Sequence, residues 1–170
     1  MSKSNKELRE LIASKESEGN YNVLVGGDEA NLTDLSIADV LELQDYMVEN
    51  GYKSSAVGKY QIKKSTIESL LYVPGTDKLR NPNDFNLDTK FDEKTQDWAA
   101  DALIERRMKA ATDTAEALGL SPTQAQALEL SKEWASLPDP RTDKSYYDGD
   151  GVNAAHHKTG DVFRVLGGQR

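Results

Sequence analysis

Glu16 is the first residue that could do acid–base chemistry, because it stands at the end of an apolar helical stripe. Leu8, Leu11 and Ile12 follow the i, i+3, i+4 spacing that marks one buried helix face. Glu16 comes four residues after Ile12 and continues that face. Burial raises the pKa of a carboxyl group and allows it to act as a general acid. The alternative is that Glu16 and Glu18 are only a solvated helix end.

Aromatic and amide side chains form a second group of candidates. Sugar rings stack on aromatic faces, and sugar hydroxyl and N-acetyl groups hydrogen-bond to amides. Four clusters have this composition: Tyr21-Asn22, Gly58-Lys59-Tyr60-Gln61, Trp134 and Tyr146-Tyr147. The alternative for each cluster is that its aromatic residues are ordinary core or surface side chains. Trp134 shares a helical stripe with Ala127 and Leu130, so its ring is expected in the core.

Metal and nucleophile chemistry find little support in the sequence. His156 and His157 are adjacent and point in different directions, which makes a poor chelating pair. The stretch 148–151 (Asp-Gly-Asp-Gly) lacks the third acidic ligand and the closing Glu of a calcium loop. There is no cysteine, phosphate-binding Gly loop, H-E-x-x-H or G-x-S-x-G. We therefore expect neither a metal nor a cofactor.

Composition narrows the possible partners. The 170 residues include 21 basic and 29 acidic side chains, for a net charge of −8. Without a basic block, nucleic acid is not an expected partner, and a polyanionic substrate must be held locally. Residues 1–9 are polar with no apolar segment behind them, so no signal peptide and no membrane insertion are expected. We expect synthesis in a host cytoplasm.

The element expected to position the acid candidate is an N-terminal helix over about Ser4 to Glu18. Tyr21 to Gly27 follows as a predicted short strand closed by a Gly-Gly turn. The remaining elements are mostly helical. The pattern therefore indicates an α+β class, mostly helical, with one small β region after the first helix.

Clear capping signals delimit the later helices. Ser36 as N-cap, with Asp39 three residues on, predicts a helix that Gly51 ends. Ser121 followed by Pro122 predicts the start of another, running to about Trp134. Further helices are predicted over 63–71, 92–111 and 161–166, and the Pro-, Gly- and Asn-rich stretch 73–89 is predicted to be an irregular rim or lid.

Two motifs resemble a known enzyme family. Glu16-Ser17-Glu18-Gly19-Asn20-Tyr21 resembles the E-S-x-G-x-[YW] signature of lysozyme-like lytic transglycosylases, and residues 55–62 resemble their second motif, which lines the cleft opposite the acid. The similarity is closer to lambda-type bacteriophage endolysins. The matching segments occur in order over most of the chain, about 8–147, and are 21–27, 32–34, 58–62, 91–97 and 134–138.

The resemblance implies a lysozyme-like fold with a small β region beside the active-site cleft. It implies one domain over 1–170, with a core of about 5–147 and a packed C-terminal extension, 148–170. It also implies a single catalytic Glu, which we carry onto Glu16. Glu18 stays an alternative, because Ser17-Glu18-Gly19 matches the S-E-G string of lambda-type enzymes. The substrate-binding residues expected are Tyr21, Asn22, Asp34, Ser55, Gly58, Tyr60, Gln61, Tyr146 and Tyr147.

The implied activity is lytic cleavage of the β-1,4 bond between N-acetylmuramic acid and N-acetylglucosamine in peptidoglycan, leaving a 1,6-anhydro product. One Glu suffices, whereas most glycosidases need two carboxylates. Asp28, Glu29 and Asp34 are candidates for a second carboxylate in an alternative muramidase-type hydrolase. A further alternative is a non-catalytic glycan-binding or structural protein of a phage particle. The expected partners are peptidoglycan strands and, in a virion, other phage proteins. The expected place of action is the periplasm, reached through holin-type release or inside the particle.

Overall fold

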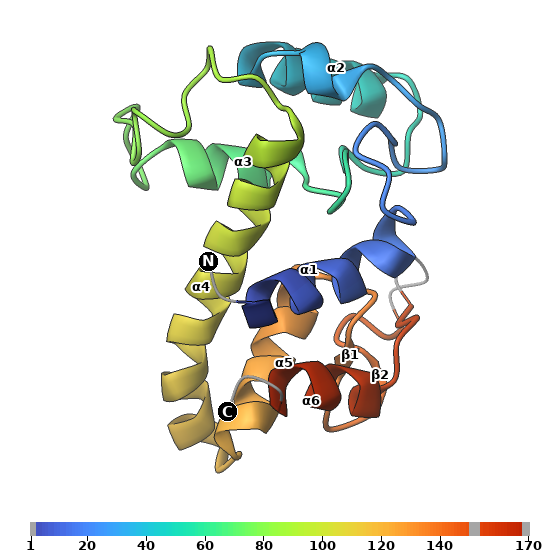
Figure 1. Ribbon diagram of the computed structural model, residues 1–170, viewed down its shortest axis with the longest axis vertical. Helices are drawn as coiled ribbons and strands as arrows, with labels where there is room; N and C mark the ends of the chain where they lie inside the picture. Colours follow the sequence, from blue (N-terminus) through green and yellow to red (C-terminus); the bar gives the residue numbers. More distant parts are fainter. Residues whose placement is uncertain (1–2, 150–153, 168–170) are drawn as a thin grey trace. The chain divides into compact units, whose positions relative to one another are not determined.

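Helices dominate the computed structural model, which describes residues 3–149 and 154–167 (Figure 1). Its described part has a mostly helical α+β composition, which confirms the coarse class expected from the sequence. The order of elements is α1 (Lys3–Glu16), a 3-10 helix η1 (Leu32–Asp34), α2 (Ile37–Glu49), α3 (Lys64–Leu71), α4 (Glu93–Leu118), α5 (Pro122–Glu133), β1 (Pro138–Asp139), β2 (Lys144–Ser145) and α6 (Thr159–Gly167).

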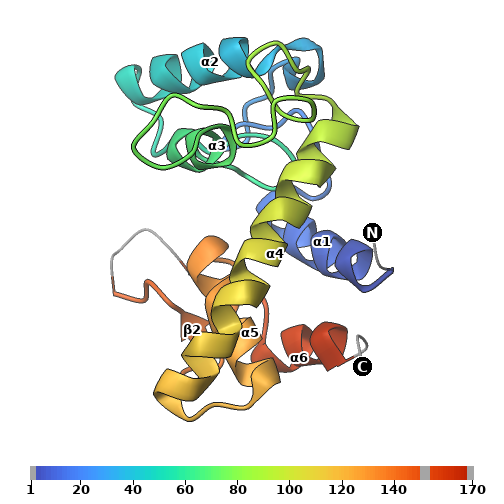
Figure 2. The same cartoon turned by 90° about the vertical axis from the view of Figure 1, so that its left-hand side faces the viewer.

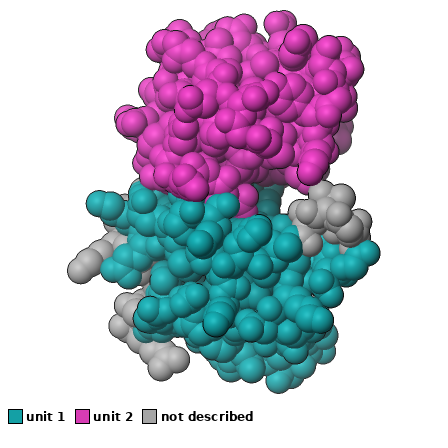
Figure 3. Space-filling model, turned by 90° about the vertical axis from the view of Figure 1, so that its right-hand side faces the viewer, with its two compact units in different colours: residues 1–15, 101–170 teal, residues 16–100 magenta. Residues whose placement is uncertain are grey.

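The chain divides into two units, coloured separately in Figure 3. Unit 1 consists of Met1–Lys15 and Asp101–Arg170, and unit 2 consists of Glu16–Ala100. Helices α1 and α4 contribute residues to both units. The acid candidate Glu16 is the first residue of unit 2 and the last of α1.

Unit 2 contains α2 and α3, which pack against each other. The predicted cap of α2 is confirmed, since Ser36 Oγ accepts a hydrogen bond from the Asp39 N–H at 3.2 Å. Gly51 follows the helix with a φ of +87°, the left-handed conformation that ends helices and favours glycine. Ile37, Val40 and the fully buried Met47 supply the apolar face of α2.

The loops of unit 2 contain isolated bridges between single residues. The strand predicted over 21–27 was wrong, because Val23 pairs only with Glu29 and Leu24 only with Val57. Gly26 and Gly27, with φ values of +92° and +101°, turn the chain before a ladder can extend. The predicted irregular stretch 73–89 contains turns and one bridge residue, as expected.

Unit 1 contains α5 and α6, which pack against each other in both views (Figures 1 and 2). A capping box starts α5: Ser121 Oγ accepts from the Gln124 N–H, and Gln124 Oε1 accepts from the Ser121 N–H. Trp134 follows α5 and is only 3% exposed, which confirms its prediction as core. Helix α6 belongs to the predicted C-terminal extension.

The two-stranded sheet of the described residues lies in unit 1, where the sequence predicted no β structure. Strands β1 and β2 are antiparallel, with Pro138 opposite Ser145 and Asp139 opposite Lys144. Arg141 stabilises the connecting turn, because its backbone and guanidinium N–H groups both donate to the Asp139 carboxylate. Such a short hairpin has too few residues to show an alternating pattern.

Helix α4 runs seven residues past its predicted end at 111, because no Gly or Pro interrupts it before Gly119. Among the described residues, no helix has the length and apolar character needed to cross a membrane.

Candidate functional site

Glu16 and Glu18 differ in environment although only one residue separates them. Glu16 ends α1 and is half-buried, whereas Glu18 is exposed and lies outside the helix. Glu18 and Gly19 adopt left-handed backbone conformations, with φ values of +54° and +83°, and this turns the chain out of the helix. Because Glu16 is more buried than Glu18, it is the better candidate for a general acid.

Ser17 connects the segment that contains Glu16 to the second motif, residues 55–62, by a hydrogen bond. Its Oγ–H donates to the backbone carbonyl of Lys59 at 2.5 Å, and the same oxygen accepts from the Gly19 N–H at 3.2 Å. Lys59 belongs to the turn formed by residues 58–61. The two segments that resemble transglycosylase motifs are therefore held together within unit 2.

The turn at 58–61 requires glycine at its first position. Gly58 has a φ of +81°, and a Cβ placed there would lie 2.4 Å from Gln96 Oε1. That oxygen accepts from the Lys59 N–H at 2.9 Å, while Gln96 Nε2 donates to the carbonyls of Tyr21 (3.1 Å) and Phe91 (2.9 Å). Gln96, only 1% exposed, thus connects the turn to the loop that carries Tyr21.

Asp97, the next residue of α4, accepts hydrogen bonds from two tyrosine hydroxyl groups. Its Oδ1 accepts from the Tyr21 hydroxyl at 2.9 Å and from the Tyr60 hydroxyl at 2.6 Å. The Lys59 ammonium lies 4.7 Å from the Tyr21 ring centre and 5.6 Å from that of Tyr60, and it donates to the Tyr21 oxygen at 3.3 Å. Burial raises the pKa of Tyr21, and the hydrogen bond to Asp97 raises it further.

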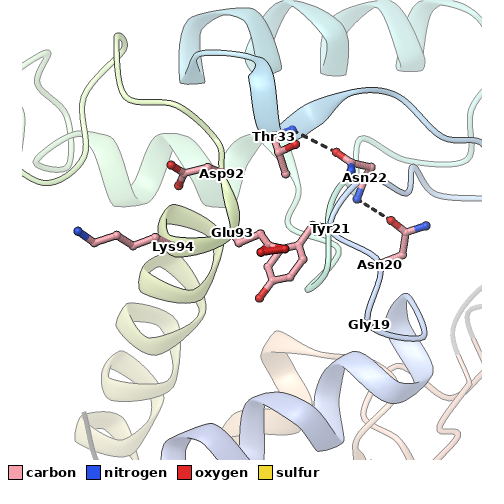
Figure 4. Close-up of a pocket in the computed structure, with 8 residues that line it drawn as sticks. All are labelled: Gly19, Asn20, Tyr21, Asn22, Thr33, Asp92, Glu93 and Lys94. Atoms are coloured by element: carbon pink, nitrogen blue, oxygen red, sulfur yellow. Dashed lines mark hydrogen bonds between the residues drawn. The ribbon is translucent and has the colours of Figure 1, made fainter.

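A pocket of about 500 Å³ opens beside this cluster, entirely within unit 2 (Figure 4). Its lining residues are Gly19, Asn20, Tyr21, Asn22, Thr33, Asp92, Glu93 and Lys94. Asn20 and Asn22 shape the wall: Asn20 Oδ1 accepts from the Asn22 N–H at 2.8 Å, and Asn22 Oδ1 accepts from the Thr33 N–H at 3.1 Å. Glu93 of α4 and Tyr21 both belong to the residues that line the pocket (Figure 4).

The predicted substrate-binding residues divide between this pocket and supporting positions. Tyr21 and Asn22 line the pocket. The Tyr60 ring is fully buried and contacts protein in this conformation. Gln61 Nε2 donates to the Gly58 carbonyl at 2.9 Å, and Ser55 Oγ accepts from the Lys64 N–H at the start of α3.

Three other predicted residues lie away from the pocket lining. Asp34 is exposed and accepts from the Asn31 amide at 2.5 Å. Tyr146 and Tyr147 belong to unit 1, where they are 42% and 39% exposed and their rings meet edge to face at 5.2 Å. The Tyr147 hydroxyl donates to the Lys132 carbonyl at 2.6 Å.

The sequence alone assigned no role to Gln96, Asp97 or Glu93. Residues 91–97 were part of the family resemblance, which was the one signal that pointed to Gln96 and Asp97. Their partners at 21 and 58–60 are far away along the chain, so no local spacing could reveal the contacts.

Comparisons with family models, curated proteins and solved structures give no match. The assignment of a function therefore depends on the residues and their geometry. Within the part of the chain that the structure describes, no group of three or more His, Asp or Glu side chains could hold a metal ion.

Proposed function

We propose that this chain is a lysozyme-like peptidoglycan lytic transglycosylase that uses Glu16 as its single catalytic carboxylate. The observation that carries the proposal is the 2.5 Å hydrogen bond from Ser17 to the Lys59 carbonyl. Through Ser17, the residue after the half-buried Glu16, it links the segment of the acid candidate to the Gly58–Gln61 turn, which belongs to the second of the two motifs that resemble this family. A nearby pocket offers a partly exposed aromatic ring, Tyr21, of the kind that binds sugars.

In this proposal Glu16 acts twice. Its carboxyl group first donates a proton to the glycosidic oxygen, which leaves with the N-acetylglucosamine fragment. The resulting carboxylate then takes the proton from the C6 hydroxyl of the N-acetylmuramic acid. That oxygen attacks C1 and closes the 1,6-anhydro ring, so atoms and protons balance without water or a second acid.

Two observations favour other functions. Glu93 brings a carboxylate to the lining of the pocket, which would suit a hydrolase that activates water with a second carboxylate. Glu16 itself is not among the residues that line the pocket, which would suit a glycan-binding protein of a phage particle without catalysis. The products formed from peptidoglycan separate the three functions.

The test is digestion of purified peptidoglycan, with mass spectrometry of the soluble fragments. We expect 1,6-anhydromuropeptides from the wild type. Glu16→Gln should lower turnover by a factor of about 10³ or more with an unchanged melting temperature, because the proton donor is lost. Glu18→Gln is the matched control and should lower turnover less than about threefold.

Other results would redirect the assignment. Reducing muramic acid ends as the sole product would identify a hydrolase, and intact peptidoglycan that still pellets the protein would identify a binding protein. Loss of turnover in Glu18→Gln alone would move the acid to Glu18. The proposed place of action is the periplasm, with delivery by holin-type release or in a virion, and mass spectrometry of purified particles would distinguish these routes.

A further inference from the structure

Tyr21 is held at both ends by two consecutive residues of α4. Gln96 binds its backbone carbonyl, and Asp97 binds its hydroxyl at 2.9 Å. A partly exposed tyrosine in a loop would otherwise be free to change rotamer. Tyr21 is also the aromatic residue of the pocket lining.

We propose that Asp97 is a positioning residue for glycan binding, which acts by fixing the Tyr21 ring as a stacking surface on the pocket wall. This inference rests on the proposed function for the identity of the ligand, an N-acetylated glycan chain. Asp97 itself is not among the lining residues, so it works through Tyr21 and need not touch the ligand.

The surrounding contacts leave the ring one orientation. The Lys59 ammonium lies 4.7 Å from the centre of the Tyr21 ring and 3.3 Å from its hydroxyl oxygen, which places it at the hydroxyl end of the ring. The Tyr21 oxygen accepts from Lys59 and donates to Asp97, which fixes the direction of the ring axis. A fixed ring loses no rotamer freedom when the ligand binds, and this favours affinity.

The chain contains a second tyrosine–aspartate pair that serves as a control. The Tyr52 hydroxyl donates to Asp28 at 2.6 Å in unit 2, and Tyr52 does not line the pocket. As with Tyr21, a hydrogen bond to a carboxylate raises the pKa of its phenol. Tyr52→Phe therefore removes the same kind of hydrogen bond as Tyr21→Phe at a place where no ligand is expected.

The experiment measures peptidoglycan turnover, binding of N-acetylglucosamine tetramer and NMR spectra of 13C-labelled tyrosine rings in the full chain. In Asp97→Ala and in Tyr21→Phe we expect KM and the tetramer Kd to rise about tenfold, with kcat changed less than about threefold. The double variant should bind no worse than Asp97→Ala alone, because Tyr21→Phe removes one of the two hydrogen bonds that Asp97→Ala already removes. Tyr52→Phe should leave KM and Kd unchanged. The Tyr21 ring signals should show increased ring mobility in Asp97→Ala.

Several outcomes would overturn the inference. An unchanged KM and Kd in Asp97→Ala, with only a lower melting temperature, would make Asp97 a purely structural residue. Additive effects in the double variant would show that Asp97 acts through another group. A wild type that binds the tetramer without cleaving peptidoglycan would refute the proposed catalysis and still test Asp97 through Kd. A wild type that does neither would refute glycan binding, and an immobile Tyr21 ring in Asp97→Ala would refute the positioning role separately.

Discussion

At the scale of single residues, the position of the acid depends on where one helix ends. The apolar stripe predicted correctly that Leu8 and Ile12 are fully buried. It also predicted that Glu16 faces the same side, and this residue is half-buried. The exposure of Glu18 has a different cause, the left-handed turn that begins at that residue. A non-glycine residue with positive φ is uncommon, so sequence alone gave no reason to expect it there.

Gly58 is the residue whose replacement should disturb the site most directly. In Gly58→Ala the methyl group would meet Gln96 Oε1 at 2.4 Å and the backbone would be held at a φ of +81°. We expect a loss of about 3 kcal/mol in the free energy of unfolding, from backbone strain and displacement of Gln96 from its hydrogen bonds. Urea unfolding of the wild type and of Gly58→Ala measures this loss.

The control for this variant is Gly75→Ala. Gly75 also has a positive φ, +73°, but nothing lies within 4 Å of the added methyl group. Gly75→Ala should therefore lower the free energy of unfolding only by the backbone strain, about 1 kcal/mol. Equal losses in the two variants would show that the contact between Gly58 and Gln96 has no energetic importance.

At the scale of elements, the sequence predicted helices well where their ends carry capping residues. Ser36 and Ser121 mark the starts of α2 and α5 as expected. The β structure was predicted in the wrong place, because the bridges at 23–24 and the sheet at 138–145 depend on partners that periodicity does not identify. Elements defined by local signals were predictable, and those defined by pairing were not.

The end of α1 provides a prediction at this scale. Ser17→Ala would remove the hydrogen bond to the Lys59 carbonyl and free the segment of Glu16 from the 58–61 turn. We expect about 1 kcal/mol lower stability and about tenfold lower kcat, because the acid is less well positioned. Thermal unfolding and peptidoglycan turnover measure the two effects.

Ser14→Ala is the matched control for that variant. Ser14 lies in the last turn of α1 and its hydroxyl donates to the Leu11 carbonyl within the same helix. The Ser14→Ala variant should leave kcat unchanged. Similar activity in Ser14→Ala and Ser17→Ala would mean that the link between the two motifs does not support catalysis.

At the scale of the whole chain, the candidate site combines residues that are distant in sequence. The acid segment and the second motif were found from their resemblance to known motifs. Gln96 and Asp97 connect them to each other and to Tyr21 across 37 to 76 positions. The sequence contains no information about these contacts that can be read without the fold, which explains why the supporting residues were missed.

Unit 1 depends on a different set of polar contacts, centred on Glu129. This carboxylate is 3% exposed and accepts from Thr114 (2.7 Å), Lys132 (2.8 Å) and Arg107 (3.3 Å). Burial alone would raise the pKa of Glu129, but the hydrogen bonds from Lys132 and Thr114 outweigh it and hold the pKa below 4.5. Its contribution to stability is therefore complete above pH 4.5 and is lost as the pH falls through the folded pKa.

The resulting prediction concerns the pH dependence of unit 1. Glu129→Gln should lower its unfolding free energy by about 3 kcal/mol at pH 7, because Arg107 and Lys132 lose a buried partner. The gap to the wild type should narrow progressively below pH 4.5, where the wild-type carboxylate takes up its proton. Trp134 lies in unit 1 and Trp98 in unit 2, so urea unfolding followed by fluorescence in a Trp98→Phe background reports on unit 1.

The exposed Glu116 of α4 provides the comparison for this experiment. Glu116→Gln makes the same chemical change at the surface of unit 1, so it should shift stability by less than about 0.5 kcal/mol at every pH. A gap between wild type and Glu129→Gln that stays constant from pH 7 to pH 3 would contradict the argument. Stability would then depend on the shape of the Glu129 side chain, and the ionised contacts with Arg107 and Lys132 would contribute no net free energy.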